Sequence, residues 1–371
     1  MRARSLLFFV LTPLIAGAAC DQSVGETSGQ VEPEVSSVFD PAYVAQAQMF
    51  EEIAAIDASA EMQAARDAFE RTLRMRAEMS MAEMMAAMSM ESGMMMPGPY
   101  DAQETAVSAG MIEALESRPS PAAVRSAYDD SPLPDRAVEV IQSGHGFESR
   151  VYEILSDGSI DDKAAALAAA VEAYLSEDLT VPAQPMPAEL LLEHPHAGAF
   201  SDGYPKLSRV LWSAQWLQLA TIEALLNDAQ QPSGGVATVN ERFQNKISNG
   251  DQSGSPAPVE LPMAPAIAPT LFSLSPDTAI VLDNLNMFEA VVADIMSYPN
   301  LEGRDALINA LADRFTSRDE DFATTYDYVV SSLRGGIYNQ GGPAIGQLAR
   351  SERNRSRSEM GMEHAMVMSV P

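Results

Sequence analysis

The spacing of apolar residues is the feature that most constrains how this chain folds. Between residues 41 and 73 apolar side chains recur at intervals of mostly three to five positions, among many good helix formers. Residues 206–227 are apolar on nearly every face, which is typical of a helix surrounded by others. No segment shows the sustained alternation of a half-buried strand. The sequence therefore predicts an all-α fold, an irregular helical bundle.

Proline and glycine mark the boundaries of the shorter predicted helices. Ser275-Pro276-Asp277 is typical of a helix start, with serine as the N-cap and proline at the first position. Residues 303–334 are expected to form one long helix or a hairpin broken near Ser317, and Gly335-Gly336 is expected to end it. The other predicted helices cover residues 101–117, 121–129, 135–155, 160–177 and 239–247.

These patterns divide the chain into six segments, of which the tether and the tail are expected to give flexible termini. The segments are a lipoprotein-type signal peptide at 1–19, a polar tether at 20–40, a main helical domain at 41–228 that includes a Met-rich run at 75–96, a Pro/Gly/Ser-rich linker at 229–270, C-terminal helices at 271–335 that pack on the main domain, and a Gly-, Arg- and Met-rich tail at 336–371.

The N-terminus carries an export signal. Two arginines precede an apolar run from Leu6 to Ile15, and small residues then lead to Cys20. The run is too short for a stable membrane span, which needs about 20 apolar residues. Because the chain's only cysteine directly follows the small residues, this end resembles the signal of bacterial lipoproteins.

The lipoprotein resemblance implies where the protein resides. Cys20 would become the acylated first residue of the mature chain and anchor it to a membrane, facing the periplasm. Asp21 slightly favours the inner membrane in this resemblance. The alternative is an ordinary signal peptide that leaves Cys20 as a free thiol.

The balance of charges excludes several classes of function. The chain has 23 Lys and Arg against 52 Asp and Glu, a formal net charge of −29, so its surface repels nucleic acid. A single cysteine excludes an internal disulfide and a Cys-rich zinc site. No dinucleotide-binding, Walker A, HExxH, GxSxG or EF-hand motif is present. We therefore expect a binding or scaffold component of the cell envelope, with an envelope protein as partner, rather than an enzyme.

Methionine is the residue type that most directly suggests chemistry. Ten of the 22 methionines lie within residues 75–96, and four more lie in the C-terminal sequence MGMEHAMVM. Thioether sulfurs are soft ligands that prefer Cu(I), and helical spacing places several of these on one face. The competing interpretation is packing, since methionine fills cores and contact surfaces adaptably. The candidate copper ligands are Met81, Met84, Met85, Met88, Met360, Met362, His364 and Met366.

A histidine and a glutamate on the predicted helix 135–155 form a second candidate metal site. His145 and Glu148 are three residues apart, so both side chains can reach one ligand. Holding zinc or iron would require further ligands. The segment SGHGFE resembles the HxxE motif of imelysin-like proteins, which are helical exported proteins tied to iron uptake. The resemblance implies an iron-related envelope function. The alternative is a surface histidine beside a solvated glutamate, with Gly144 and Gly146 marking a kink.

A third motif places His194 and His196 on either side of a proline. Two imidazoles in a loop can chelate a borderline divalent metal. Because such a pair supplies only two ligands, solvated side chains are the favoured interpretation.

Overall fold

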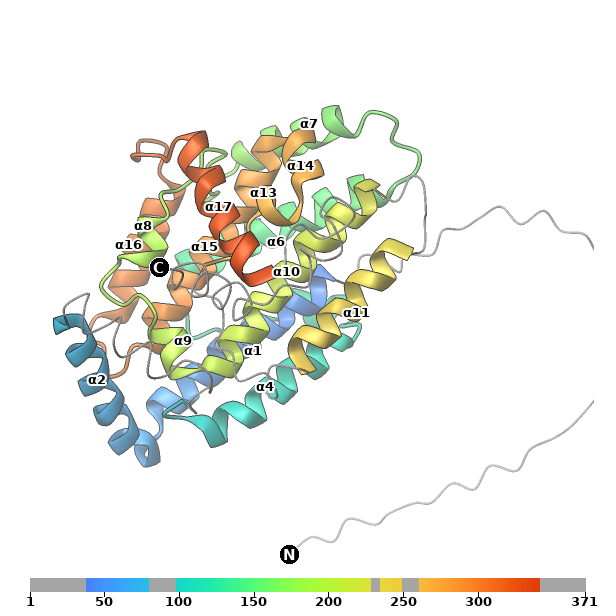
Figure 1. Cartoon of the computed structure of the whole chain (residues 1–371). Coiled ribbons are helices and arrows are strands. Elements are labelled where there is room, and N and C mark those ends of the chain that lie inside the picture. The colour runs from blue at the N-terminus through green and yellow to red at the C-terminus, as the bar shows by residue number, and fades with distance from the viewer. Residues whose placement is uncertain (1–37, 80–97, 228–233, 249–259, 341–371) are drawn as a thin grey trace, which may run out of the picture. The chain divides into compact units, whose positions relative to one another are not determined.

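The structure is a computed structural model that describes residues 38–79, 98–227, 234–248 and 260–340 (Figure 1). Within these ranges all regular structure is helical and no strand occurs, which confirms the predicted all-α fold. No helix in the same ranges is long and apolar enough to cross a membrane. The predicted signal peptide and Cys20 lie outside the described residues.

The first two helices form a corner rather than one continuous helix. The periodicity runs without a break, but α1 (Phe39–Ala58) and α2 (Gln63–Glu78) are separated by the single turn η1 (Ala60–Met62). Arg66 is buried in this corner and donates hydrogen bonds to the carbonyl oxygens of Ile56 at 3.0 Å and Ser59 at 2.7 Å. Each of these carbonyl oxygens also accepts a backbone N–H, from Ser59 and Met62 respectively, so the guanidinium adds a second hydrogen bond to each and holds the turn in place.

The middle of the chain supplies the central helix of the core and the helices around it. The predicted helix at 206–227 is confirmed as α10, and 18 of its residues, from Pro205 to Ala224, are buried. Asp162 caps one of the surrounding helices by accepting a hydrogen bond from the backbone of Ala165. The helices of this part are α4 (Asp101–Glu116), α5 (Pro121–Arg125), α6 (Asp135–Ser156), α7 (Lys163–Leu175), α8 (Glu189–Leu192), α9 (Ala199–Gly203) and α10 (Pro205–Asn227).

The C-terminal helices pack on the same core. Helix α15 begins at the predicted Ser275-Pro276, although the Ser275 hydroxyl bonds to that of Thr278 rather than to a backbone N–H. The chain breaks after α16 at Ser317, and α17 follows. The elements are α11 (Gly234–Ser248), α13 (Ala264–Ile267), α14 (Pro269–Leu274), α15 (Pro276–Ser297), α16 (Arg304–Thr316) and α17 (Thr325–Gln340).

Two features of this region differ from the sequence analysis. The segment predicted as a linker contains the helix expected at 239–247, which is α11 and begins earlier, at Gly234; it also contains α13, which was not predicted, and its apolar residues Leu261, Met263 and Ile267 are buried in the core. The prediction that Gly335-Gly336 ends the last helix is wrong, because α17 continues to Gln340. A glycine inside a helix costs only about 1 kcal/mol relative to alanine, which other residues can offset.

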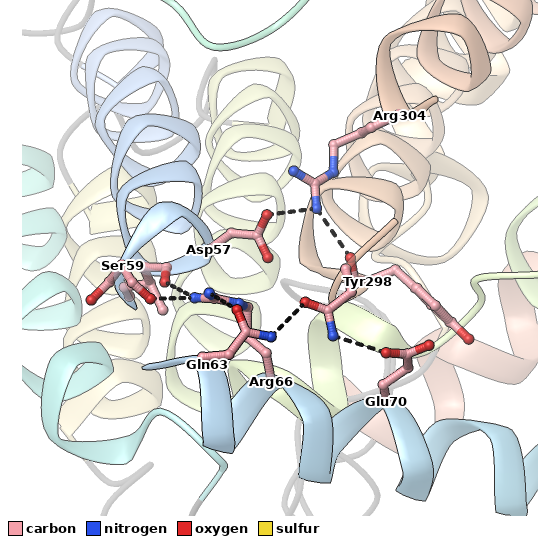
Figure 2. A network of polar contacts seen from close by, with 9 residues as sticks. Asp57, Ser59, Gln63, Arg66, Glu70, Tyr298 and Arg304 are labelled. Atoms are coloured by element: carbon pink, nitrogen blue, oxygen red, sulfur yellow. Dashed lines mark hydrogen bonds and ion pairs between the residues drawn. The ribbon is translucent and has the colours of Figure 1, made fainter. Parts of the chain in front are cut away.

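A polar network ties the α1–α2 corner to the connection between α15 and α16 (Figure 2). Arg304 bridges from its guanidinium to the Asp57 carboxylate at 2.9 Å and to the Tyr298 carbonyl oxygen at 3.1 Å. The side-chain amide of Asn300 donates to Glu70 at 2.8 Å. These contacts join segments from opposite ends of the chain, which places α15 and α1 beside each other in the core.

Candidate functional site

A polar cavity lies inside the bundle where α1, α6, α10 and α15 meet. Its volume is about 20 Å³, which is enough for one water molecule or one bare ion. The two residues of the predicted HxxE pair both line it, as the spacing on one helix face requires. The polar residues around the cavity are Tyr43, Gln46, His145, Glu148, Gln215, Gln218 and Glu289.

Gly144 sets the distance between the two helices that carry the carboxyl groups. A Cβ atom at this position would stand 2.6 Å from a methyl carbon of Leu285 on α15. The structure thus gives Gly144 a packing role, because only glycine lets α6 approach α15 this closely. A Cβ at Gly146 would meet nothing within 4 Å. The close approach brings Glu148 and Glu289 to one cavity.

His145 is held in a defined orientation. Its Nε2 lies 3.2 Å from the Asp40 carboxylate, and its ring stacks on Tyr43 with 4.0 Å between the ring centroids. Burial lowers the pKa of His145, against the opposing attraction of Asp40, so the ring is neutral at pH 7. With the Nε2 proton directed to Asp40, Nδ1 carries the lone pair. This Nδ1 is buried and has no hydrogen-bond partner among the described residues.

The two glutamates of the cavity raise each other's cost of ionisation. Burial raises the pKa of Glu148 well above its usual range, and the charge of Glu289 adds to this effect. Burial also raises the pKa of Glu289 to about 7, against the opposing effect of neighbouring side-chain amides. Two carboxyl groups that line one small cavity in a low-dielectric interior are not both readily ionised unless a cation lies between them. At neutral pH the pair therefore holds a proton or takes a cation.

Gln215 connects this carboxyl pair to α10. Its side-chain nitrogen lies 3.4 Å from the Glu289 carboxylate and 3.3 Å from the Asn286 carbonyl oxygen, while its Oε1 is buried without a partner in the described part of the chain. Nδ1 of His145 and Oε1 of Gln215 are thus both buried acceptors without a hydrogen-bond partner among the described residues. Together with the two carboxyls, these acceptors make the cavity suited to a cation or to a hydrogen-bond donor.

The side chains do not already form a coordination shell. Among the described residues, no group of three His, Cys, Asp or Glu side chains is placed to hold a metal ion. His145, Glu148 and Glu289 face one cavity, and binding an ion there would require their side chains to rotate toward it.

The other predicted metal ligands fall into two groups. Met81, Met84, Met85, Met88, Met360, Met362, His364 and Met366 lie outside the described residues, so copper binding by methionine stays a prediction. The pair His194 and His196 is described. His194 lies 3.1 Å from the Asp294 carboxylate, and the His196 ring packs edge-on against Tyr298. These contacts engage both imidazoles in holding their loop on α15.

Several residues of the cavity escaped the sequence analysis. Glu289 follows the buried Phe288 on α15 and is itself half-buried, and Gln215 is a buried polar residue on the apolar helix α10. A polar residue on a buried face is the signal that points to such a position, since buried polar groups are uncommon. Asp40 carries no such signal, because its role depends on how α1 and α6 pack together.

Comparisons with known proteins found no protein similar to this chain. No family model matches the chain, no curated protein matches it, and no solved structure matches it. The resemblance to imelysin-like proteins therefore depends on the SGHGFE segment of α6 alone.

Proposed function

We propose that this chain is an exported, lipid-anchored binding protein of the bacterial cell envelope, attached through Cys20, and that its polar cavity binds a divalent transition-metal ion. The signal sequence and the unique cysteine support export and attachment to a membrane. The main support for a metal ion as the ligand is the contact between His145 and Asp40. Metal-binding histidines almost always donate their second ring N–H to a carboxylate or carbonyl, and Asp40 occupies that place for His145.

The chemistry of the cavity favours one class of metal. An imidazole nitrogen and two carboxylates are the ligands that Zn²⁺, Fe²⁺ and Mn²⁺ accept, whereas Cu(I) prefers sulfur. A divalent ion would also neutralise the charges of Glu148 and Glu289. The formal net charge of −29 draws cations toward the protein, without selecting among them.

Binding is expected to strengthen as the pH rises. Both carboxyls must lose their protons before they can bind a metal ion, and the pKa of Glu289 is raised to about 7. Affinity should therefore increase between pH 6 and pH 8.

The test is a competition between the purified, detergent-solubilised protein and a chromogenic Zn²⁺ chelator at pH 7.5. We expect His145→Gln to abolish specific binding and Asp40→Asn to weaken it about 10- to 100-fold, as is typical for a partner of a metal-binding histidine. His194→Gln is the matched control, since His194 also bonds to an aspartate but lies away from the cavity. Absence of stoichiometric binding by the unaltered protein, or equal losses in the control, would contradict the metal assignment.

A further inference from the structure

Helix α11 packs on α10 and places the Lys246 amine over the only two tryptophans of the chain (Figure 1). Its Nζ lies 5.3 Å from the centre of the Trp212 ring and 4.7 Å from that of Trp216. The two rings are one turn apart on α10, so a single amine can contact both. The indole N–H of Trp212 donates to the carbonyl oxygen of Glu260 at 2.9 Å, which fixes that ring. The amine therefore has a defined and largely apolar surrounding.

The other lysines of the chain are engaged in a different way. The sequence contains only three lysines. Nζ of Lys163 donates to the carbonyl oxygens of Ile154 at 2.7 Å and Asp157 at 2.6 Å, at the end of α6. Nζ of Lys206 lies 2.9 Å from the Asp101 carboxylate. Both of these amines thus bind oxygen atoms and join segments of the fold.

We propose that Lys246 is a modification site for small aldehydes, with which its amine condenses to form an imine. The nitrogen lone pair adds to the carbonyl carbon while a proton moves from nitrogen to oxygen, and water then leaves to form the C=N bond. This reaction changes no oxidation state, so it needs no oxidant or reductant. The Lys246 side chain is only partly buried, so a small reagent can reach it. The site does not depend on the metal assignment.

Burial and neighbouring charges favour the neutral, nucleophilic form of this amine. Burial lowers the pKa of Lys246 to about 8, and the positive charges of Arg242, one turn earlier on α11, and Arg209 on α10 add to this effect. The tryptophan rings attract the ammonium form, but burial and the two arginines oppose it. At pH 7.5 roughly a quarter of Lys246 is then neutral, against about 0.1% of an ordinary lysine with a pKa of about 10.4. Desolvation beside another cation is a known way to activate a lysine.

The test is reductive labelling of the purified full-length protein with acetaldehyde and cyanoborohydride. Cyanoborohydride reduces each imine to a stable ethylamine, and peptide mass spectrometry assigns the label to one lysine or to the terminal amine. At pH 7.5 we expect Lys246 to be labelled about tenfold faster than Lys163 or Lys206, because more of its amine is neutral, although a less basic amine is also less nucleophilic. The labelling rate of Lys246 should reach half of its maximum near pH 8.

Unfolding and substitution show whether the fold causes this reactivity. In concentrated urea the three lysines should be labelled at similar rates. Arg242→Gln removes one neighbouring positive charge, so half-maximal labelling of Lys246 should move to higher pH, whereas Arg150→Gln on the exposed face of α6 should leave it unchanged. Circular dichroism confirms that both variants fold.

Three results would overturn the proposal. They are labelling of Lys246 no faster than that of Lys163 and Lys206, a preference for Lys246 that persists in urea, and a labelling rate of Lys246 that still rises at pH 10 as for an ordinary lysine. His145→Gln should be labelled normally at Lys246, so failure of the metal assignment and failure of this proposal are distinguishable.

Discussion

Asp283→Asn tests whether burial of a carboxyl group makes the stability of this fold depend on pH. Asp283 lies on α15 and is 1% exposed. Its oxygens accept hydrogen bonds from the backbone N–H of Ala264 at 2.9 Å and from the Tyr328 hydroxyl at 2.5 Å. Burial raises its pKa to about 7 despite these bonds. Asparagine has the same shape and offers both an acceptor and a donor, but it carries no charge at any pH.

The size and sign of the effect follow from the difference between the folded and unfolded pKa values. Below about pH 4 the carboxyl is protonated in both states and adds no pH dependence. Between about pH 4 and 7 the folded state keeps a proton that the unfolded state releases, so wild-type stability falls by about 1.4 kcal/mol per pH unit. Above pH 7 the loss is complete, at about 4 kcal/mol in total. The variant should show none of this loss.

The assay is urea unfolding followed by tryptophan fluorescence at pH 5 and pH 8, which avoids the isoelectric region near pH 4.3. Relative to wild type, Asp283→Asn should gain about 3 kcal/mol between the two pH values, because two of the three pH units of the transition are covered. Tyr328→Phe is the control, since it keeps the carboxyl and should keep the pH dependence. A difference between variant and wild type that stays constant from pH 5 to pH 8 would refute the argument from burial.

Three further predictions concern packing, the methionines and the anchor. Gly144→Ala should destabilise the fold by about 1–3 kcal/mol in thermal or urea unfolding, because its Cβ meets Leu285, whereas Gly146→Ala should be neutral or stabilising by up to about 1 kcal/mol. Cys20→Ser should release the protein from membranes into the soluble fraction; a variant that stays membrane-bound with unchanged mobility would contradict lipidation. Replacing a set of four methionines by leucine should abolish any Cu(I) affinity measured by chelator competition while stability changes little, and an unaltered protein that binds no more Cu(I) than this variant would exclude copper. The set is Met81, Met84, Met85 and Met88.

The helices could be predicted where their determinants are local. Helices α4, α6 and α10 follow from residue spacing, and α15 also from its Ser-Pro start, since these signals lie within one segment. The break at Ser59 could not, because Arg66 and the contacts of the corner stabilise it rather than the residues at the break. The burial of Leu261 and Met263 was also missed, since a Pro-rich composition hides short apolar stretches that pack only against distant helices.

The residues of the candidate site likewise fall into those that local spacing predicts and those that only helix packing brings together. His145 and Glu148 share a helix face, so their convergence on one cavity follows from their spacing alone. Glu289 and Asp40 belong to other helices, and their positions depend on how α6 packs against α15 and α1. A single sequence holds no record of such contacts. The sequence therefore predicts that His145 and Glu148 lie together, but it does not predict that Glu289 and Asp40 lie beside them.

The buried acids of this bundle differ in their hydrogen-bond partners, and this difference distinguishes the acid of the polar cavity from the others. Glu104 accepts hydrogen bonds from the backbone N–H groups of Lys206 and Leu207 at the start of α10, and Asp283 and Asp294 likewise bind backbone donors. Each of these carboxyls therefore holds one segment on another. Among the described residues no hydrogen bond to the Glu148 carboxyl is found, and Glu148 instead faces a second acid.

An arrangement of this kind lowers stability unless something else is bound. Replacing Glu148 by an apolar residue of similar size would cost the fold no hydrogen bond and would remove a like-charge contact with Glu289. Proteins keep features that oppose folding mainly where function requires them. The structural carboxyls, by contrast, would each leave unpaired backbone N–H groups if removed. This contrast, rather than the number of acids in the core, is why the cavity at Glu148 and His145 is the part of the fold best explained by a ligand.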